Sequence, residues 1–415
     1  MNAMAADVAV VGAGIVGLSS ASFLRRAGVP VTVYDPLPPG GGASYGNGGL
    51  LSVEACIPIS TPGMLRQVPR WLADPLGPLA VSPRHFPKAL PWLLRWIRAG
   101  RMDRVLRSSD ALRALHVPGL DQYRDLLGGD DFHDLIRTSG QVHVWTGERE
   151  SRGELIARQL RERHGVVAEK LDPAELRQLV PGISPAIRRA LFVPKNGYTV
   201  NPHRVVGRVG ERFRAAGGTL RQERVMRILP ADGGWRIVTN TGDRRHSRVV
   251  VAGGAWSKDL LAPLGVRIPL EAERGYHVTI RDPSVEVRIP VLHQSMGFGA
   301  TPMEMGLRIG GTVEIAGLDI PMSPARAERM MALGRWLFPR LDGKEVSMWM
   351  GYRPGTPDSV PIIDAAPGHA GLYIACGHGH TGMTAGAVTG KLVAQLVQGE
   401  PTMVDLQHFR IARFG

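Results

Sequence analysis

The sequence predicts an α/β region combined with an α+β region, and three observations support this fold class. At the N-terminus, a short apolar run leads into a glycine-rich turn, an amphipathic helix and a second apolar run. Far downstream, RVVVAGGAW at 248–256 is another apolar strand followed by glycines. Between 265 and 345, the strand-like ERGYHVTI and the hairpin-like MGLRIGGTVEIAG indicate a mostly antiparallel sheet.

The N-terminal segment DVAVVGAGIVGLSSASFLRRAGVPVTVYD carries a dinucleotide-binding motif of the Rossmann type. Gly12 permits the tight turn, Gly14 lets the backbone approach a pyrophosphate, and Gly17 lets the helix pack on the strand. The free N–H groups at the start of the helix attract phosphate. Asp35 ends the second strand, where its carboxylate can accept hydrogen bonds from ribose hydroxyls. The residues expected to contact the cofactor here are Gly12, Gly14, Ile15, Val16, Gly17 and Asp35.

A second glycine-rich segment, PLPPGGGASYGNGGLLS, follows directly. A simple NAD-binding domain has no need of it. The ribityl chain and isoalloxazine ring of a flavin, in contrast, extend beyond the pyrophosphate and need further backbone contacts, so the segment favours FAD. The residues expected to make these contacts are Ala43, Ser44, Asn47, Gly48, Gly49 and Leu50.

Further apolar, strand-like segments occur far downstream of the N-terminal motif. They predict a nucleotide-binding domain whose sheet is built from discontinuous segments of the chain. The later segments are expected to complete the cofactor site through Val225, Ala252, Gly253, Gly254 and Trp256. The predicted division is a Rossmann-type FAD-binding domain from 1–57, 197–264 and 346–415, a substrate domain from 136–196 and 265–345, and a basic helical insertion or cap from 58–135.

Six segments, in order along nearly the whole chain, resemble the D-amino-acid-oxidase superfamily of FAD-dependent oxidoreductases. They are the N-terminal motif, GGASYGNGG, VVVAGGAWS, GLRIGGTVEIAG, GYRPGTPDSVPIID and GLYIACGHGHTGMTAGAVTGKLVAQLV. Within this superfamily, SYGNGGLLS and the long basic insertion after it most resemble the bacterial D-amino-acid dehydrogenases and D-hydroxyproline dehydrogenases.

The resemblance implies an enzyme that oxidises a D-amino acid by hydride transfer from the α-carbon to flavin N5. D-proline and 4-hydroxy-D-proline are among the implied substrates, and the electrons pass to a quinone or another acceptor. Catalysis in such enzymes depends mostly on positioning and on the flavin, and the sequence shows no dedicated base. Related sarcosine oxidases attach their flavin through a cysteine where this chain has Gly351, so noncovalent FAD is expected.

The arginine of GYRPGTPDS is expected to bind the substrate carboxylate. A guanidinium group binds a carboxylate through two parallel charge-assisted hydrogen bonds, which fix both position and orientation. In the resembling family the arginine of this segment has that role, and it corresponds to Arg353. Tyr276 is a second catalytic candidate for carboxylate binding, although an ordinary half-buried strand tyrosine fits the pattern equally well.

The segment CGHGHTGMT follows an apolar strand and opens a helix, whose positive end can stabilise negative charge on a reduced flavin. His380 is expected to face the substrate or the flavin and is the third catalytic candidate, while His378 supports the turn. No further ligand motif accompanies these histidines and Cys376, so no metal site is predicted. The residues expected to lie along the flavin are Gly377, Gly379, His380, Thr381, Gly382, Met383 and Thr384.

Residues 58–107 are basic and contain Trp71, Trp92 and Trp96, the last two at helical spacing with arginines between them. Two interpretations stay open. One is an interfacial helix that lies on anionic lipid, which suits a dehydrogenase delivering electrons to a quinone. The other is a cap whose tryptophans pack over the substrate domain.

The chain has 50 Lys and Arg residues against 37 Asp and Glu residues, a formal net charge of +13. This favours anionic partners, although a composition bias toward arginine explains it equally well. Two widely separated cysteines and a strand that begins at Asp7, with no signal peptide before it, predict a cytoplasmic protein. On the interfacial interpretation it is peripheral on the inner face of the cytoplasmic membrane.

Three other functions are compatible with the sequence. A glycine- or sarcosine-type amine oxidase of the same superfamily would use O2 as its acceptor. Some tRNA-modifying enzymes carry the same oxidative domain, but this chain has no methyltransferase-like segment or RNA-binding motif, so nucleic acid is not favoured as a partner. The third is a flavin-binding subunit without catalytic activity.

Overall fold

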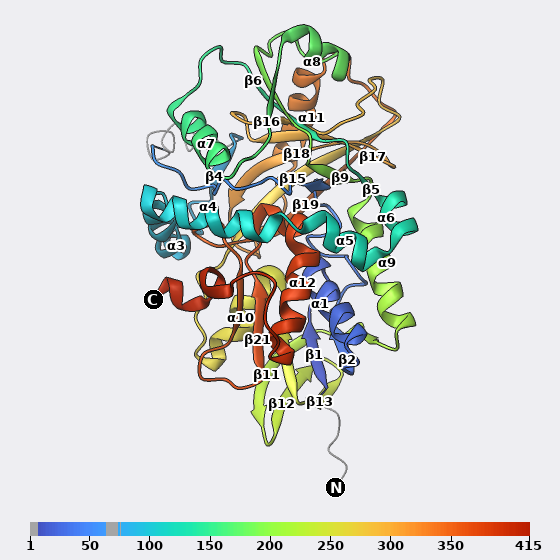
Figure 1. Ribbon diagram of the computed structural model, residues 1–415, viewed down its shortest axis with the longest axis vertical. Coiled ribbons are helices and arrows are strands. Elements are labelled where there is room, and N and C mark those ends of the chain that lie inside the picture. The colour runs from blue at the N-terminus through green and yellow to red at the C-terminus, as the bar shows by residue number, and fades with distance from the viewer. Residues whose placement is uncertain (1–6, 64–73, 75) are drawn as a thin grey trace.

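The computed structural model describes residues 7–63, 74 and 76–415, and its lower half in Figure 1 is built on a six-stranded sheet. The first five strands in this sheet are parallel and the last is antiparallel to its neighbour. In spatial order they are β10 (Thr219–Arg221), β2 (Val31–Tyr34), β1 (Val8–Val11), β14 (Arg248–Val251), β21 (Leu372–Cys376) and β20 (Ile362–Ala365). The sheet is therefore assembled from widely separated parts of the chain, as an α/β nucleotide-binding region requires.

The two faces of this sheet are covered differently. Val8 and Val10 of β1 point toward helices, whereas Ala9 and Val11, one residue along, pack on a second sheet, because side chains alternate along a strand. The helices are α1 (Ile15–Arg26), α9 (Pro202–Ala215) and α12 (Gly382–Gln398). The second sheet is antiparallel and consists of β11 (Val225–Ala231), β12 (Gly234–Thr239) and β13 (Gly242–His246).

The upper half contains a nine-stranded sheet that is antiparallel except for the pairs β16–β6 and β18–β4. Helix α11 (Pro324–Leu337) packs on one face of it through Ala327, Met330 and Leu333. The strands in order are β19 (Glu345–Gly355), β15 (Glu271–Arg281), β18 (Gly306–Ile315), β17 (Phe298–Met303), β16 (Val291–His293), β6 (Gln141–Trp145), β8 (Arg189–Val193) and β7 (Glu169–Leu171), with β4 (Leu79–Val81) beside β18. The predicted combination of α/β and α+β structure is confirmed.

One local prediction within this sheet is wrong. MGLRIGGTVEIAG does not form a hairpin by itself, because Gly310 and Gly311 lie inside the single strand β18. The hairpin forms between β17 and β18 instead. A Cβ atom at Gly311 would lie 2.4 Å from the Gly297 carbonyl oxygen, so the glycine serves close strand packing rather than a turn.

The predicted boundary at 346 falls within β19. That strand pairs with β15 along its whole length, from Glu345 to Gly355, and is an outer strand of the upper sheet. The chain then enters β20 of the lower sheet at Ile362. We therefore place the boundary after Gly355, so that β19 ends where the two halves meet.

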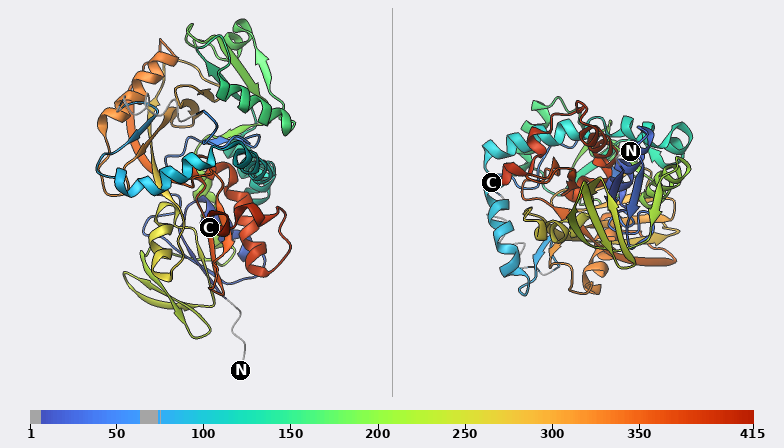
Figure 2. Two further views of the ribbon diagram at one scale, coloured as in Figure 1. Left: turned by 90° about the vertical axis from the view of Figure 1, so that its left-hand side faces the viewer. Right: turned by 90° about the horizontal axis from the view of Figure 1, so that it is seen from below.

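Helices of the insertion cross the middle of the molecule (Figure 1), and α3 runs along its outside (Figure 2). They are α3 (Phe86–Ala99), α4 (Met102–His116), α5 (Gly119–Leu127) and α6 (Gly129–Leu135). A small sheet of β3 (Leu50–Leu51), β9 (Gly197–Thr199) and β5 (Ile136–Arg137) lies between the halves, and α7 (Arg152–Arg163) and α8 (Pro173–Leu179) flank the upper sheet. Trp71 lies outside the described residues.

Candidate active site

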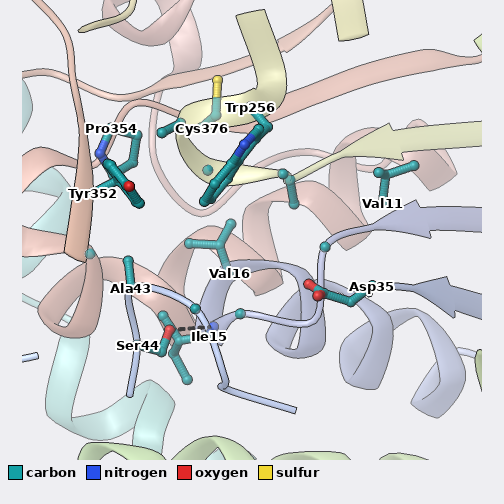
Figure 3. A pocket seen from close by; sticks show the side chains of 18 of the residues that line it. Val11, Ile15, Val16, Asp35, Ala43, Ser44, Trp256, Tyr352, Pro354 and Cys376 are labelled. Atoms are coloured by element: carbon teal, nitrogen blue, oxygen red, sulfur yellow. Dashed lines mark hydrogen bonds between the residues drawn. The ribbon is translucent and has the colours of Figure 1, made fainter. Parts of the chain in front are cut away.

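A first cavity, of about 460 Å³, lies at the carboxyl ends of the parallel strands, where ligands bind in open α/β sheets. Figure 3 shows Asp35 on one side of it and Tyr352 and Pro354 on the other. The predicted cofactor residues that line this cavity are Gly12, Gly14, Ile15, Val16, Asp35, Ala43, Ser44, Asn47, Val225, Ala252, Gly253, Gly254, Trp256, Gly379, Gly382 and Met383.

The N-terminal motif accepts only glycine at two positions, one in the turn after β1 and one in the first turn of α1. Gly12 has a φ angle of +113°, and a Cβ atom there would lie 2.3 Å from the Ala252 carbonyl oxygen. A Cβ atom at Gly17 would lie 1.9 Å from the Gly12 carbonyl oxygen. Ser44 Oγ accepts a 3.1 Å hydrogen bond from the Ile15 N–H, which ties the second glycine-rich segment to the start of α1 (Figure 3).

The Asp35 carboxylate is held in place by backbone groups. Its Oδ2 accepts from the Ala13 N–H at 2.7 Å and its Oδ1 from the Leu37 N–H at 2.8 Å. Burial raises the pKa of Asp35, and the two backbone N–H groups oppose that shift. Each oxygen keeps acceptor capacity for a ribose hydroxyl.

These features fit FAD. The helix start at Gly14 suits a pyrophosphate, Asp35 suits a ribose, and the buried Met383 and half-exposed Trp256 provide apolar walls. Other predicted cofactor residues lie around this cavity without lining it. Gly49, at a φ angle of +74°, and Gly377, at +85°, make turns, and Thr384 Oγ1 accepts a hydrogen bond from the Ser52 N–H. The residues in this group are Gly17, Gly48, Gly49, Leu50, Gly377, His380, Thr381 and Thr384.

A second cavity, of about 360 Å³, opens between the loop at 43–50 and strands of the upper sheet. Gly48, Leu50 and His380 line this one. Ala43, Asn47 and Arg353 line both cavities, so the two meet at Arg353.

Arg353 lies flat across the upper sheet. A Cβ atom at Gly275 of β15 would lie 2.1 Å from its Nη2 atom, so the glycine makes room for the guanidinium group. Its Nη1 donates to the Thr312 carbonyl oxygen at 2.9 Å. Burial lowers the pKa of Arg353 and the nearby Glu273 carboxylate opposes this shift, yet no carboxylate of the described residues forms an ion pair with it. Its guanidinium group is therefore available to a ligand.

The other two catalytic candidates differ in their surroundings. His380 Nε2 lies 3.1 Å from Glu273 Oε2 at the edge of the second cavity, with its side chain 38% exposed. The Tyr276 hydroxyl instead donates to Glu314 Oε2 at 2.6 Å and accepts from the Ser323 N–H at 3.3 Å. Tyr276 lines the second cavity, but its hydroxyl already has two partners within the protein, so its contact with a substrate carboxylate stays a prediction.

Several residues of the second cavity were not among the predicted site residues, and for one of them, His277, the sequence left a site role and a structural role equally open. His277 Nδ1 donates to the Gly46 carbonyl oxygen at 3.0 Å, and its ring stacks on Trp349 with a centroid distance of 5.1 Å. Burial lowers the pKa of His277 to about 3, so the ring is neutral. Trp349 lies across Gly351, where a Cβ atom would be 1.9 Å from the indole ring. Glycines inside strands β15 and β19 were the available signal for this cavity.

His378, which is expected to support the turn, lies at the first cavity, and its side chain bonds to helix α12. It is buried, and its Nε2 lies 2.9 Å from Thr389 Oγ1. Burial lowers the pKa of His378 to about 3. The described part of the chain contains no group of three or more His, Cys, Asp or Glu side chains that could hold a metal ion. Its helices include none that is both long and apolar enough to cross a membrane.

Comparisons with known proteins agree with this architecture. The family model described as DAO, FAD dependent oxidoreductase, matches residues 7–396. A D-amino-acid oxidase from Bradyrhizobium diazoefficiens is 36% identical over 415 residues, and a D-amino acid dehydrogenase from Allorhizobium ampelinum is 30% identical over 426 residues, each covering 98% of both chains. The crystal structure of glycine oxidase from Geobacillus kaustophilus has a TM-score of 0.76 at 22% identity and 98% coverage of both chains. The chain therefore belongs to the family of DAO-type FAD-dependent oxidoreductases.

Proposed function

We propose that this protein oxidises D-amino acids with FAD, by hydride transfer from the substrate α-carbon to flavin N5. The observation that carries the proposal is the position of Arg353, which lines both the cofactor cavity and the second cavity and has no ion-pair partner among the described residues. FAD, when bound, supplies the hydride acceptor. Arg353 holds the substrate carboxylate, so that the adjacent carbon lies at the junction of the cavities.

Other residues of the second cavity support this binding mode. Neutral His277 and the indole ring of Trp349 stack on each other and form a wall that adds no charge to the cavity. The paired His380 and Glu273 stand beside Arg353, where they can orient the amino group of the substrate. The names of the two similar bacterial proteins, a D-amino-acid oxidase and a D-amino acid dehydrogenase, support the D configuration.

Anaerobic bleaching of the flavin tests the proposal. Purified protein loaded with FAD is mixed with a panel of D- and L-amino acids, glycine and sarcosine, and the absorbance near the flavin maximum is followed. We expect several D-amino acids to reduce the flavin and their L-enantiomers to leave it oxidised. Reduction by L-amino acids alone, or by none of the panel, would contradict the proposal. Hydrogen peroxide yield in air then separates an oxidase from a dehydrogenase that uses a quinone.

The size of the second cavity favours substrates with a side chain. At about 360 Å³ it has room beyond the α-carbon, which glycine and sarcosine leave unused. D-proline and 4-hydroxy-D-proline fall within the proposed substrate class and belong in the same panel. Faster bleaching by glycine than by every D-amino acid would favour the amine-oxidase alternative.

We further propose that FAD is bound noncovalently. The space beside Gly351 is filled by Trp349, and burial raises the pKa of Cys376, which lines the first cavity, to about 12. Burial also raises the pKa of Cys56, the other cysteine, to about 11. A protonated thiol is a poor nucleophile toward a flavin. Acid precipitation should therefore release all the flavin into the supernatant, and flavin retained in the pellet would contradict this.

The outward face of α3 supports a proposed peripheral contact with anionic membrane on the cytoplasmic side. Trp92 and Trp96 are buried and stacked, and Trp92 Nε1 donates to the Gly355 carbonyl oxygen at 3.1 Å, so the tryptophans pack as a cap. The opposite face exposes an apolar stripe among cations, the profile of an interfacial helix. The exposed apolar residues are Phe86, Leu90, Leu94 and Ile97, and the exposed cations are Lys88, Arg95 and Arg98, with Arg84 just before the helix.

A further inference from the structure

The second cavity holds a buried cation, Arg308, in addition to the arginine that is proposed to bind the α-carboxylate. Two of its described lining residues are arginines, Arg308 and Arg353, and none is aspartate or glutamate; the nearby Glu273 carboxylate lies on the Arg353 side. A buried cation is costly unless an anion pairs with it. A D-amino acid with a neutral side chain brings one carboxylate, which occupies Arg353, and leaves Arg308 without a counter-charge.

Arg308 is the more buried of the two, at 5% exposed. Its Nε donates to Thr279 Oγ1 at 3.2 Å and its Nη1 to the Asn47 carbonyl oxygen at 2.7 Å, both neutral acceptors. No described residue accepts a hydrogen bond from Nη2, and no described carboxylate forms an ion pair with the group. Burial lowers the pKa of Arg308 to about 10, which keeps it charged at neutral pH.

The two guanidinium groups lie on the same side of the sheet. Arg353 crosses Gly275 of β15, and Arg308 bonds to Thr279 of the same strand. His277 lies between Gly275 and Thr279 on β15. Burial is the largest cause of its lowered pKa, and both arginines lower the pKa further. Four residues of strand span about 13 Å at ~3.3 Å per residue. An ion pair places the guanidinium and carboxylate charge centres roughly 4 Å apart. One such pair at each end of the ~13 Å span leaves about 5 Å between the two carboxylate carbons. A molecule the size of aspartate or glutamate spans this distance.

We propose that the second cavity selects D-amino acids with an acidic side chain, of the D-aspartate and D-glutamate class, with the α-carboxylate on Arg353 and the side-chain carboxylate on Arg308. This inference rests on the proposed oxidation of D-amino acids and narrows its substrate class. The buried Thr312 Oγ1, which has no hydrogen-bond partner among the described residues and belongs to a residue lining the same cavity, adds a polar group suited to such a ligand.

Charge specificity tests the proposal in the wild-type enzyme. The kcat/KM for D-glutamate is compared with that for D-glutamine, which has the same shape without the charge, using the FAD-loaded protein. One charge-assisted hydrogen bond predicts a preference for D-glutamate of about 10-fold or more. Equal values, or a preference for D-glutamine, would overturn the inference while leaving D-amino-acid oxidation intact.

Variants assign the preference to Arg308. Arg308→Gln is expected to reduce the D-glutamate to D-glutamine ratio to about one or below, and Arg308→Lys to retain part of it, because the charge remains. The matched control is Arg227→Gln, an exposed position on β11 that lines neither cavity, and it should keep the wild-type ratio. A ratio unchanged in Arg308→Gln would refute the assignment, and the ratio is insensitive to a general loss of folded enzyme.

Binding without turnover separates the two proposals. Calorimetry on the FAD-loaded protein compares glutarate, a dicarboxylate with no amino group, with valerate, the corresponding monocarboxylate. We expect glutarate to bind about 10-fold or more tightly, and the difference to disappear in Arg308→Gln. If glutarate shows this dependence while no D-amino acid reduces the flavin, the anionic site stands and the proposed reaction fails. If glutarate and valerate bind equally, the inference fails.

Discussion

Replacement of Arg353 by alanine removes the group on which substrate orientation depends. The guanidinium lies at the junction of the two cavities, over Gly275, with one Nη group committed to the Thr312 carbonyl oxygen. The substitution therefore deletes the hydrogen bonds to the substrate carboxylate and opens a water-filled space beside the reacting carbon. Arg353→Lys keeps the positive charge but loses the planar fork that holds both carboxylate oxygens.

The size of the effect follows from the hydrogen bonds that the substitution removes. Hydrogen bonds to charged groups contribute about 1.5–3 kcal/mol each. Because Arg308 and His380 remain nearby, we take about 3 kcal/mol for the whole effect of Arg353→Ala, or on the order of 150-fold in kcat/KM. For Arg353→Lys, which retains one charge-assisted hydrogen bond, we expect about 10-fold.

Anaerobic stopped-flow measurement of flavin bleaching, over a range of substrate concentrations, gives the required constants. Since Arg353 also lines the cofactor cavity, FAD content is measured by absorbance for each variant, and rates are expressed per bound flavin. Arg227→Ala, on the exposed side of β11, is the control and should match the wild type. An Arg353→Ala enzyme within threefold of wild-type kcat/KM on the best substrate would refute the assignment of this arginine.

Three further predictions concern the cofactor, pH and the membrane. Gly12→Ala should yield protein without FAD, measured as the flavin-to-protein absorbance ratio, because the new Cβ atom would lie 2.3 Å from the Ala252 carbonyl oxygen. Burial lowers the pKa values of His116 and His277 to about 4 and about 3, whereas histidine in an unfolded chain titrates near 6.5. The unfolded chain therefore binds more protons below pH ~6.5, and urea unfolding should show about 2 kcal/mol less stability per histidine at pH 5 than at pH 7. Co-sedimentation with anionic liposomes at low salt should fall in Leu90→Ser/Leu94→Ser.

Each of these has a control or a contradicting result. Gly28→Ala also places alanine at a positive φ angle, of +81°, but with nothing within 4 Å of the new Cβ atom, and it should keep its FAD. Equal free energies of unfolding at pH 5 and pH 7 would contradict the neutral state of the buried histidines. Leu155→Ser removes an exposed leucine from α7 and should leave liposome binding unchanged; wild-type protein that stays in the supernatant would exclude the membrane contact.

The cofactor side of the molecule could be predicted from the sequence because its determinants are local. The strand, turn and helix around Gly12 and the acid at Asp35 follow one another within a short segment, and the structure places both residues at the first cavity. The tight turn and the helix start impose these residue types wherever the motif occurs. The residues within this short segment were therefore sufficient to predict most of the cofactor-binding features.

The substrate side could not be predicted to the same extent because it depends on strand pairing. The ladder between β15 and β18 shifts in register between Arg274 and Tyr276. Such an irregularity cannot be recognised from residue types alone. Arg308 and Trp349 reach the second cavity only because β18 and β19 flank β15. The sequence also showed the helical spacing of apolar residues in α3. It could not show which of the two apolar faces of this helix points inward, because packing against the neighbouring sheet decides that.

The course of the chain after β19 has a consequence for how specificity can change. Arg353 stands two residues before the end of that strand, and the next strand, β20, already belongs to the lower sheet. The anchor for the acid group common to all amino acids thus lies in the upper sheet, next to the point where the chain crosses to the half that holds the cofactor. Strands β18, β17 and β16, which shape the room for the variable part of the substrate, lie on the far side of β15 in the same sheet, away from this crossing. Substitutions there can alter which molecule is accepted while the reactive carbon keeps its place.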